Sequence, residues 1–123
     1  MAYWLTGLRA GNEPSSATEK YARALGSHDG VSTDDAGHIL ANRLGGCGTC
    51  PINIFPQLPH LNRGAWRSFE ADVYECIHGS STKATLSWTF TYASTTKTRP
   101  SSMVYAASYT SGCASKQQSY SNE

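Results

Sequence analysis

The strongest alternation of hydrophobic and polar side chains lies in the C-terminal third of the chain. Apolar residues occupy every second position between residues 84 and 92, which predicts a strand with one apolar face. Residues 103–109 predict a partner strand, and the polar connection between the two predicts a hairpin. Residues 2–8 are predicted to form an edge strand or an extended segment. Residues 115–123 are polar, and we expect them to be frayed.

A short helix is predicted over residues 16–25. The segment 16–19 fits a capping box, in which the first Ser accepts a hydrogen bond from the backbone and the Glu reaches back. Gly26 is placed to end the helix in a left-handed conformation. Tyr21 and Leu25 lie about one turn apart, and we expect both to face the core.

The middle of the chain predicts a β-loop-β-α arrangement. Residues 33–44 alternate like a strand or an extended segment, residues 45–51 form a loop rich in Gly and Cys, and residues 53–55 predict a short second strand. From residue 62 to residue 77, apolar side chains recur at the three- and four-residue intervals of an amphipathic helix. Together these segments predict an α+β fold.

Length and composition add few constraints on function. A chain of 123 residues fits one domain, and we expect residues 1–123 to form a single one. Hydrophobic residues make up 39% and charged residues 15%, which excludes a largely disordered chain. The net charge of +1 gives no electrostatic argument for a polyanionic partner. There is no transmembrane stretch, so no membrane partner is expected.

The four cysteines have two interpretations. They allow three pairings if all are oxidised, and we favour Cys47 with Cys50 and Cys76 with Cys113, as structural disulfides of a secreted protein. No signal peptide is visible, so a secreted protein would have its leader missing from this sequence. Alternatively, Cys47 and Cys50 form half of a zinc site or a redox dithiol, although no second close pair of ligands supports zinc.

Three short boxes and one acidic residue carry the chemistry. The first box is DDAGH at residues 34–38, the second is NIFPQ at residues 53–57, and the third is LNRGAW at residues 61–66, followed by Glu70. In residue type, order and spacing they resemble the DNA/RNA non-specific endonuclease family of ββα-metal nucleases, in its DDAGH branch. The boxes and the segment between them cover roughly the middle third of the chain.

The resemblance implies a metal-dependent endonuclease that hydrolyses DNA, with RNA as an open second substrate. It implies a ββα-metal core with a small antiparallel sheet and one main helix that carries metal-site residues. His38 would be the general base, Asn62 the direct ligand of Mg²⁺, and Glu70 would hold the water shell of the metal. Asp35 would support the metal site, and Asn53 would fix the backbone around His38. Mn²⁺ or another divalent ion could replace Mg²⁺. Because Glu70 follows Asn62 by eight residues, we expect both on one face of one helix.

Contacts with the phosphate are less well defined. Ala36 stands where the related DRGH motif has an arginine, so another residue must meet the phosphate. Arg23 and Arg43 are the candidates, and we prefer Arg23. Arg63 and Arg67 lie one helical turn apart and could touch phosphate, although an ordinary solvated helix face explains them equally well.

Other polar and aromatic residues near the boxes have structural interpretations. Gln57 is expected to support the loop that faces the phosphate. We expect Trp66 in the core rather than stacked on a base. Asp34 is either a turn acceptor or a site residue. His60 is a minor candidate for substrate contact.

Several biological settings fit this chemistry. The resemblance implies a secreted nuclease or effector, or the toxin domain of a larger secreted protein with a dedicated immunity partner. A non-catalytic nucleic-acid or protein-binding module on the same scaffold is the main alternative, and a small disulfide-stapled interaction protein is a second. The joint presence of His38, Asn62 and Glu70 disfavours a decayed enzyme. No oligomeric state is predicted.

Overall fold

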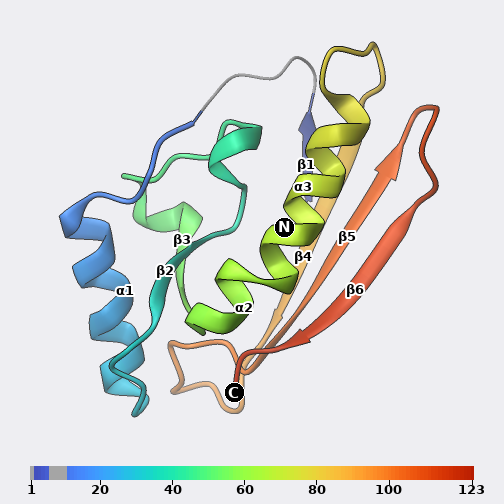
Figure 1. The fold of residues 1–123 in the computed structure, drawn as a ribbon. Coiled ribbons are helices and arrows are strands. Elements are labelled where there is room, and N and C mark those ends of the chain that lie inside the picture. The colour runs from blue at the N-terminus through green and yellow to red at the C-terminus, as the bar shows by residue number, and fades with distance from the viewer. Residues whose placement is uncertain (1, 6–10) are drawn as a thin grey trace.

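Two antiparallel sheets and three α-helices form the part of the chain that the structure, a computed structural model, describes: residues 2–5 and 11–123 (Figure 1). This arrangement confirms the predicted α+β class. The elements are, in order, β1 (Ala2–Leu5), α1 (Ser16–His28), β2 (Asp35–His38), the 3₁₀ turns η1 (Asn42–Leu44) and η2 (Pro51–Asn53), β3 (Ile54–Gln57), α2 (Pro59–Arg63), α3 (Ala65–Ile77), β4 (Ala84–Thr91), β5 (Ser102–Tyr109) and β6 (Lys116–Ser121).

The larger sheet has the strand order β1-β4-β5-β6, and α3 lies across one of its faces (Figure 1). The hairpin of β4 and β5 is confirmed, and the apolar positions of β4 are buried from Ala84 to Trp88. Phe69 of α3 stacks on Tyr105 of β5 with ring centroids 4.1 Å apart. Strand β1 pairs with β4 at the sheet edge, which confirms the edge-strand prediction for residues 2–5. Residues 6–8, which the prediction also covered, lie outside the described residues.

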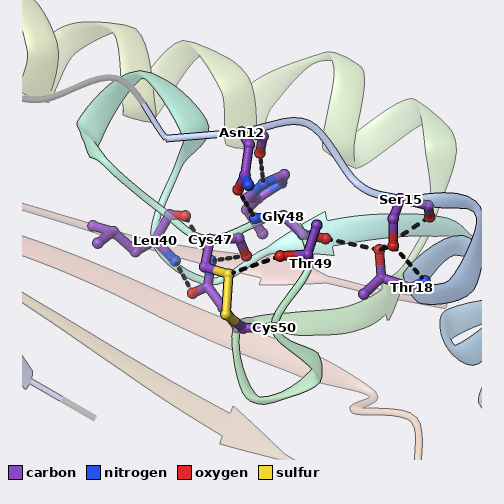
Figure 2. Close-up of a disulfide and its surroundings, with 10 residues drawn as sticks. Asn12, Ser15, Thr18, Leu40, Cys47, Gly48, Thr49 and Cys50 are labelled. Atoms are coloured by element: carbon purple, nitrogen blue, oxygen red, sulfur yellow. Dashed lines mark hydrogen bonds between the residues drawn. A yellow bond between two sulfur atoms is a disulfide. The ribbon is translucent and has the colours of Figure 1, made fainter.

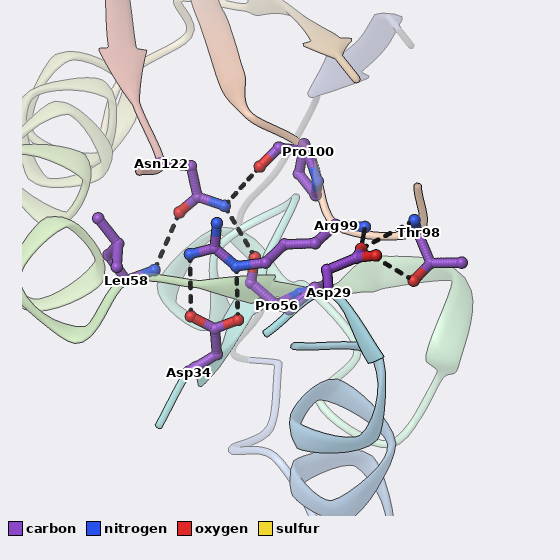
Figure 3. A network of polar contacts seen from close by, with 8 residues as sticks. All are labelled: Asp29, Asp34, Pro56, Leu58, Thr98, Arg99, Pro100 and Asn122. Atoms are coloured by element: carbon purple, nitrogen blue, oxygen red, sulfur yellow. Dashed lines mark hydrogen bonds and ion pairs between the residues drawn. The ribbon is translucent and has the colours of Figure 1, made fainter. Parts of the chain in front are cut away.

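The prediction that residues 115–123 are frayed is wrong. Strand β6 pairs with β5 from Lys116 to Ser121, because a backbone ladder forms regardless of how polar the side chains are. Tyr120 anchors the strand against the ring of Trp66, with centroids 5.4 Å apart. Asn122 is fully buried, and hydrogen bonds compensate the burial of its polar side chain. It donates to the carbonyls of Pro56 and Pro100 and accepts from the Leu58 N–H at 2.9 Å (Figure 3).

A buried ion pair joins the β4–β5 connection to the start of β2 (Figure 3). Arg99 donates through Nε and a terminal nitrogen to both carboxylate oxygens of Asp34, at 2.7 and 3.0 Å. Their side chains are 6% and 0% exposed. This bidentate geometry compensates the burial of both charges. Of the two interpretations of Asp34, the contacts therefore support the structural one, as an ion-pair partner rather than a turn acceptor.

Helix α1 begins at Ser16 as predicted, but its N-cap and its end differ from the prediction. Ser15, not Ser16, is the N-cap, because its hydroxyl accepts from the Thr18 N–H at 3.2 Å. Gly26 does not end the helix, which continues to His28 and is followed by Gly30 in a left-handed conformation with φ +90°.

The buried face of α1 also differs from the prediction. Thr18, Ala22 and Gly26 are buried, whereas Tyr21 is 42% exposed and Leu25 is only partly buried. Helix α1 contacts both β2 and β3, and small side chains allow that close approach. A side chain at Gly26 would collide with the Asp34 carboxylate. The spacing of the large residues Tyr21 and Leu25 therefore predicted the wrong face of α1 as the buried one.

The predicted helix over residues 62–77 is interrupted at Gly64, which separates α2 from α3. The residue has φ −115° and ψ −109°, which is not helical, and a Cβ there would lie 2.7 Å from the His60 carbonyl oxygen. The apolar spacing continues across the break, so the pattern did not reveal it. As a result, Asn62 and Glu70 do not share one helix face.

Both preferred disulfides are present. Cys47–Cys50 closes a tight loop after η1, and Cys76–Cys113 joins the end of α3 to the segment before β6. The second bridge closes a loop with a sequence separation of 37, a constraint that typically stabilises a fold by about 2–4 kcal/mol. These bonds exclude the zinc and free-dithiol interpretations in this state. Among the described residues, no helix is long and apolar enough to cross a membrane.

Candidate active site

A cavity of about 450 Å³ opens where β2, η1, α2 and α3 meet. It brings together most of the polar residues that the sequence singled out, from four separate segments. Its lining consists of Glu13, Pro14, Ala36, His38, Ala41, Asn42, Arg43, Asn62, Arg63, Arg67 and Glu70.

His38 is the last residue of β2, and its backbone and ring are both held. The Trp66 indole N–H donates to the His38 carbonyl at 3.3 Å. The imidazole Nε2 lies 3.0 Å from the carbonyl oxygen of Asn12. Because a carbonyl only accepts, Nε2 carries the hydrogen, and in the neutral ring Nδ1 is then the unprotonated nitrogen. His38 is thus arranged to accept a proton at Nδ1.

The Asn53 side chain forms hydrogen bonds with the backbone that follows His38. Its Oδ1 accepts from the Leu40 N–H at 2.9 Å, and its Nδ2 donates to the carbonyls of Leu40 and Cys47 at 3.0 and 3.1 Å. Its own carbonyl accepts from the Ile39 N–H at 2.8 Å. These contacts are of the kind expected for a residue that fixes the loop, and Asn53 does not line the cavity.

Asp35 links Asn62 to Arg63. Its Oδ2 accepts from Asn62 Nδ2 at 3.0 Å and from Arg63 Nε at 2.9 Å, while its Oδ1 accepts from a terminal nitrogen of Arg63 at 2.8 Å. The hydrogen bonds to Asp35 raise the pKa of Arg63. Because the Asn62 amide nitrogen is anchored in this way, its Oδ1 remains available as a neutral oxygen ligand for a hard cation.

Glu70 lies against the cavity with 9% of its surface exposed. Burial raises the pKa of its carboxyl to about 8, although the charges of Arg43 and Arg67 oppose that rise. No group among the described residues donates a hydrogen bond to it. A buried carboxylate without donors is costly unless a cation or an ordered water compensates it. Together with the Asn62 amide oxygen, Glu70 therefore fits a divalent cation with a water shell, held by few protein ligands.

The arginines are divided between two surfaces. Arg43, Arg63 and Arg67 line the cavity, and the Arg43 guanidinium lies 5.7 Å from the centre of the Tyr74 ring. Arg23, which we preferred from the sequence as the phosphate contact, lies on the exposed face of α1 and does not line the cavity. The placement therefore favours Arg43, because α1 turns its small residues rather than Arg23 toward β2 and β3.

Two other expectations have clear placements. Trp66 is fully buried in the core, as predicted. Gln57 is also fully buried, and its side-chain nitrogen and oxygen have no hydrogen-bond partner among the described residues. It lies beside Gly37, where a Cβ would meet the Gln57 side chain, and it does not line the cavity. Any support that Gln57 gives is therefore through the β2–β3 hairpin.

The sequence analysis missed the segment before α1. Glu13 and Pro14 line the cavity, and Asn12 contacts His38. Glu13 accepts from Asn42 Nδ2 at 2.5 Å. No spacing or box marks these residues, because they precede His38 by more than twenty positions and meet it only in the folded chain.

Comparisons with known proteins show the family of this chain. The family model described as DNA/RNA non-specific endonuclease matches residues 5–110. A protein of Dickeya dadantii (strain 3937) named "Probable deoxyribonuclease RhsA" is 45% identical over 100 residues, which are 80% of this chain. The match covers 6% of that relative, so the chain spans only a small part of its length. The chain therefore belongs to the DNA/RNA non-specific endonuclease family and is an endonuclease, that is, a phosphodiester hydrolase.

Proposed function

We propose that His38 is the general base of this endonuclease and takes a proton from the attacking water at Nδ1. The observation that carries the proposal is the convergence of His38, Asn62 and Glu70 on one cavity from three separate elements. General-base catalysis of this kind typically contributes about 10²–10⁴-fold to the rate. The Asn12 and Asn53 contacts support the role, because they hold the ring and the following backbone in one arrangement.

Asn62 and Glu70 would hold a divalent cation, with Mg²⁺ as the first candidate and Mn²⁺ as the second. When bound there, such a cation supplies Lewis-acid stabilisation for charge on the phosphate. Asp35 would orient the Asn62 amide through its hydrogen bond to Nδ2. Arg43 and Arg67 face the same cavity and would bind the non-reacting phosphates of the substrate. These proposed contacts are with the phosphates and not with the bases, so cleavage independent of sequence is expected.

DNA is the proposed substrate, and the name of the Dickeya relative, a probable deoxyribonuclease, supports it. RNA remains a second substrate to be tested. The two disulfides fit a protein that works outside the cell. The matched relative is much longer than this chain, and with the disulfides we propose a nuclease domain of a larger secreted protein that acts as a toxin or effector. A dedicated inhibitor that covers the cavity would then be the expected partner.

The test is degradation of plasmid DNA and of a structured RNA by the oxidised protein. Reactions contain Mg²⁺, Mn²⁺ or a chelator, and the variants are His38→Ala and the matched control His28→Ala, which changes an exposed histidine at the end of α1. Cleavage that needs the metal and His38 but not His28 supports the proposal and shows the substrate range. Full activity of His38→Ala would refute the general-base role, and undiminished activity in chelator would refute the metal site.

A further inference from the structure

The carbonyl that contacts the His38 ring belongs to the N-terminal arm, defined as residues 11–14. The arm is distant from His38 in the sequence, but in the fold it lies against the loop that follows β2. The Gly11 N–H donates to the Asn42 carbonyl at 2.8 Å, and the Asn12 N–H donates to the Gly46 carbonyl at 3.2 Å. The position of the Asn12 carbonyl therefore depends on how firmly the arm is held against that loop.

The Asn12 side chain adds a third attachment, to the disulfide loop, defined as residues 47–50 (Figure 2). Asn12 Oδ1 accepts from the Gly48 N–H at 2.5 Å, and the Gly48 carbonyl accepts from the Thr18 hydroxyl at 2.7 Å. A Cβ at Gly48 would collide with the backbone of Asn12 and Glu13, so the arm and the disulfide loop fit closely. The Cys47–Cys50 bond brackets Gly48 and limits the movement of this contact.

We propose that Asn12 is a positioning residue for His38, and that its side-chain bond to Gly48 keeps its carbonyl in place for the imidazole Nε2–H. The proposal rests on the role of His38 as general base. A neutral imidazole carries one hydrogen, and the hydrogen bond made by one ring nitrogen decides which nitrogen keeps its lone pair. If the carbonyl moves away, the ring can adopt the other tautomer, in which Nδ1 cannot accept a proton. A small misplacement of a catalytic group is costly, since about 1 Å can reduce a rate by about 10²-fold.

The variants Asn12→Ala and Asn12→Asp test this inference, because Ala removes the acceptor for Gly48 and Asp retains one. Nitrogen-15 NMR of the imidazole reports the tautomer of His38 without any nucleic acid, and steady-state cleavage of DNA with Mg²⁺ reports kcat and KM. For Asn12→Ala we expect a mixture of tautomers, a kcat about tenfold lower and a KM within about twofold of the parent. Asn12→Asp is expected to keep the Nε2–H tautomer and most of the rate. Thr49→Ala is the matched control, because Thr49 lies on the same loop and, among the described residues, its hydroxyl contacts Cys47 of that loop rather than the arm.

Each result decides between the two claims. Retention of the Nε2–H tautomer in Asn12→Ala would overturn the positioning role, whatever the rate. A changed tautomer with an unchanged kcat would instead refute His38 as the general base. Gly48→Ala provides an independent disturbance, since it leaves Asn12 intact but places a methyl group against the arm. It is expected to produce the same mixed tautomer and the same loss of kcat, and a native tautomer in this variant would also contradict the proposal.

Discussion

Two halves of the molecule are each stabilised internally by a different kind of contact. The half formed by α3 and the larger sheet is built on apolar and aromatic contacts, such as the stacked rings of Phe69 and Tyr105. The half formed by α1, the β2–β3 hairpin and the arm is built on hydrogen bonds between side chains and backbone, many from Asn12 and Asn53. Hydrophobic burial is non-directional, whereas a hydrogen bond fixes direction and distance. The polar half is therefore suited to orient His38, and the apolar half to support it.

Trp66 joins these halves. Its ring contacts Phe55 of β3 at 5.7 Å and Tyr105 of β5 at 5.0 Å between centroids, and its N–H binds the His38 carbonyl. The variant Trp66→Ala is expected to have the largest effect, a loss of about 3–5 kcal/mol in the free energy of unfolding. Urea denaturation followed by circular dichroism measures it. The control is Ser68→Ala, on the exposed face of α3. A loss below about 1 kcal/mol for Trp66→Ala would show that the halves are stable independently.

Glu70 is expected to reduce the stability of the apolar half at neutral pH, because its carboxyl is buried on α3. Its folded pKa of about 8 lies above the ordinary value of 4.5, so its contribution to stability is complete below pH 4.5 and is lost as the pH rises through 8. Since one unit corresponds to about 1.4 kcal/mol, stability in chelator should fall by about 3–4 kcal/mol between about pH 5 and pH 8.

The variant Glu70→Gln isolates this effect. It should remove most of that pH dependence and unfold at higher urea than the parent at pH 8, while cleaving DNA poorly. Addition of Mg²⁺ at pH 8 should stabilise the parent but not the variant, because ligand binding favours the folded state. Equal pH slopes for the two proteins would contradict the assignment of the raised pKa to Glu70.

The same contrast explains what the sequence predicted. Alternation and helical spacing depend on apolar faces, so they predicted β4, β5 and α3, and the boxes predicted three site residues, His38, Asn62 and Glu70, that line one cavity. They missed features that apolar spacing does not encode: the break at Gly64, which is a backbone conformation, and β6, whose ladder is made by the backbone. They also missed the arm, because its contacts with the loop after β2 are long-range and polar.

Asn62 on α2 donates to Asp35 of the polar half, and it is expected to matter for activity alone. The variant Asn62→Ala removes the amide oxygen that would bind the metal, and cleavage should fall by about 100-fold or more, since even supporting residues of metal sites are worth about 10–100-fold. The free energy of unfolding in chelator should change by less than about 1 kcal/mol, because the side chain is only partly buried. Asp35→Asn should give a smaller loss, and higher Mg²⁺ should partly restore it. A rate of Asn62→Ala within threefold of the parent would refute the ligand assignment.

The smallest expected effect, on KM and salt dependence, distinguishes Arg43 from Arg23, the two arginines that the sequence offered as phosphate contacts. Arg43 lines the cavity with its guanidinium beside the Tyr74 ring, whereas Arg23 points away on α1. We expect Arg43→Ala to raise KM for DNA about tenfold and to reduce the salt dependence of binding by about one phosphate contact. Arg23→Ala should leave both within about twofold of the parent. Cleavage assays at two salt concentrations separate the cases. The opposite result would mean that DNA extends over α1, and that the phosphate contact lies outside the cavity that holds His38.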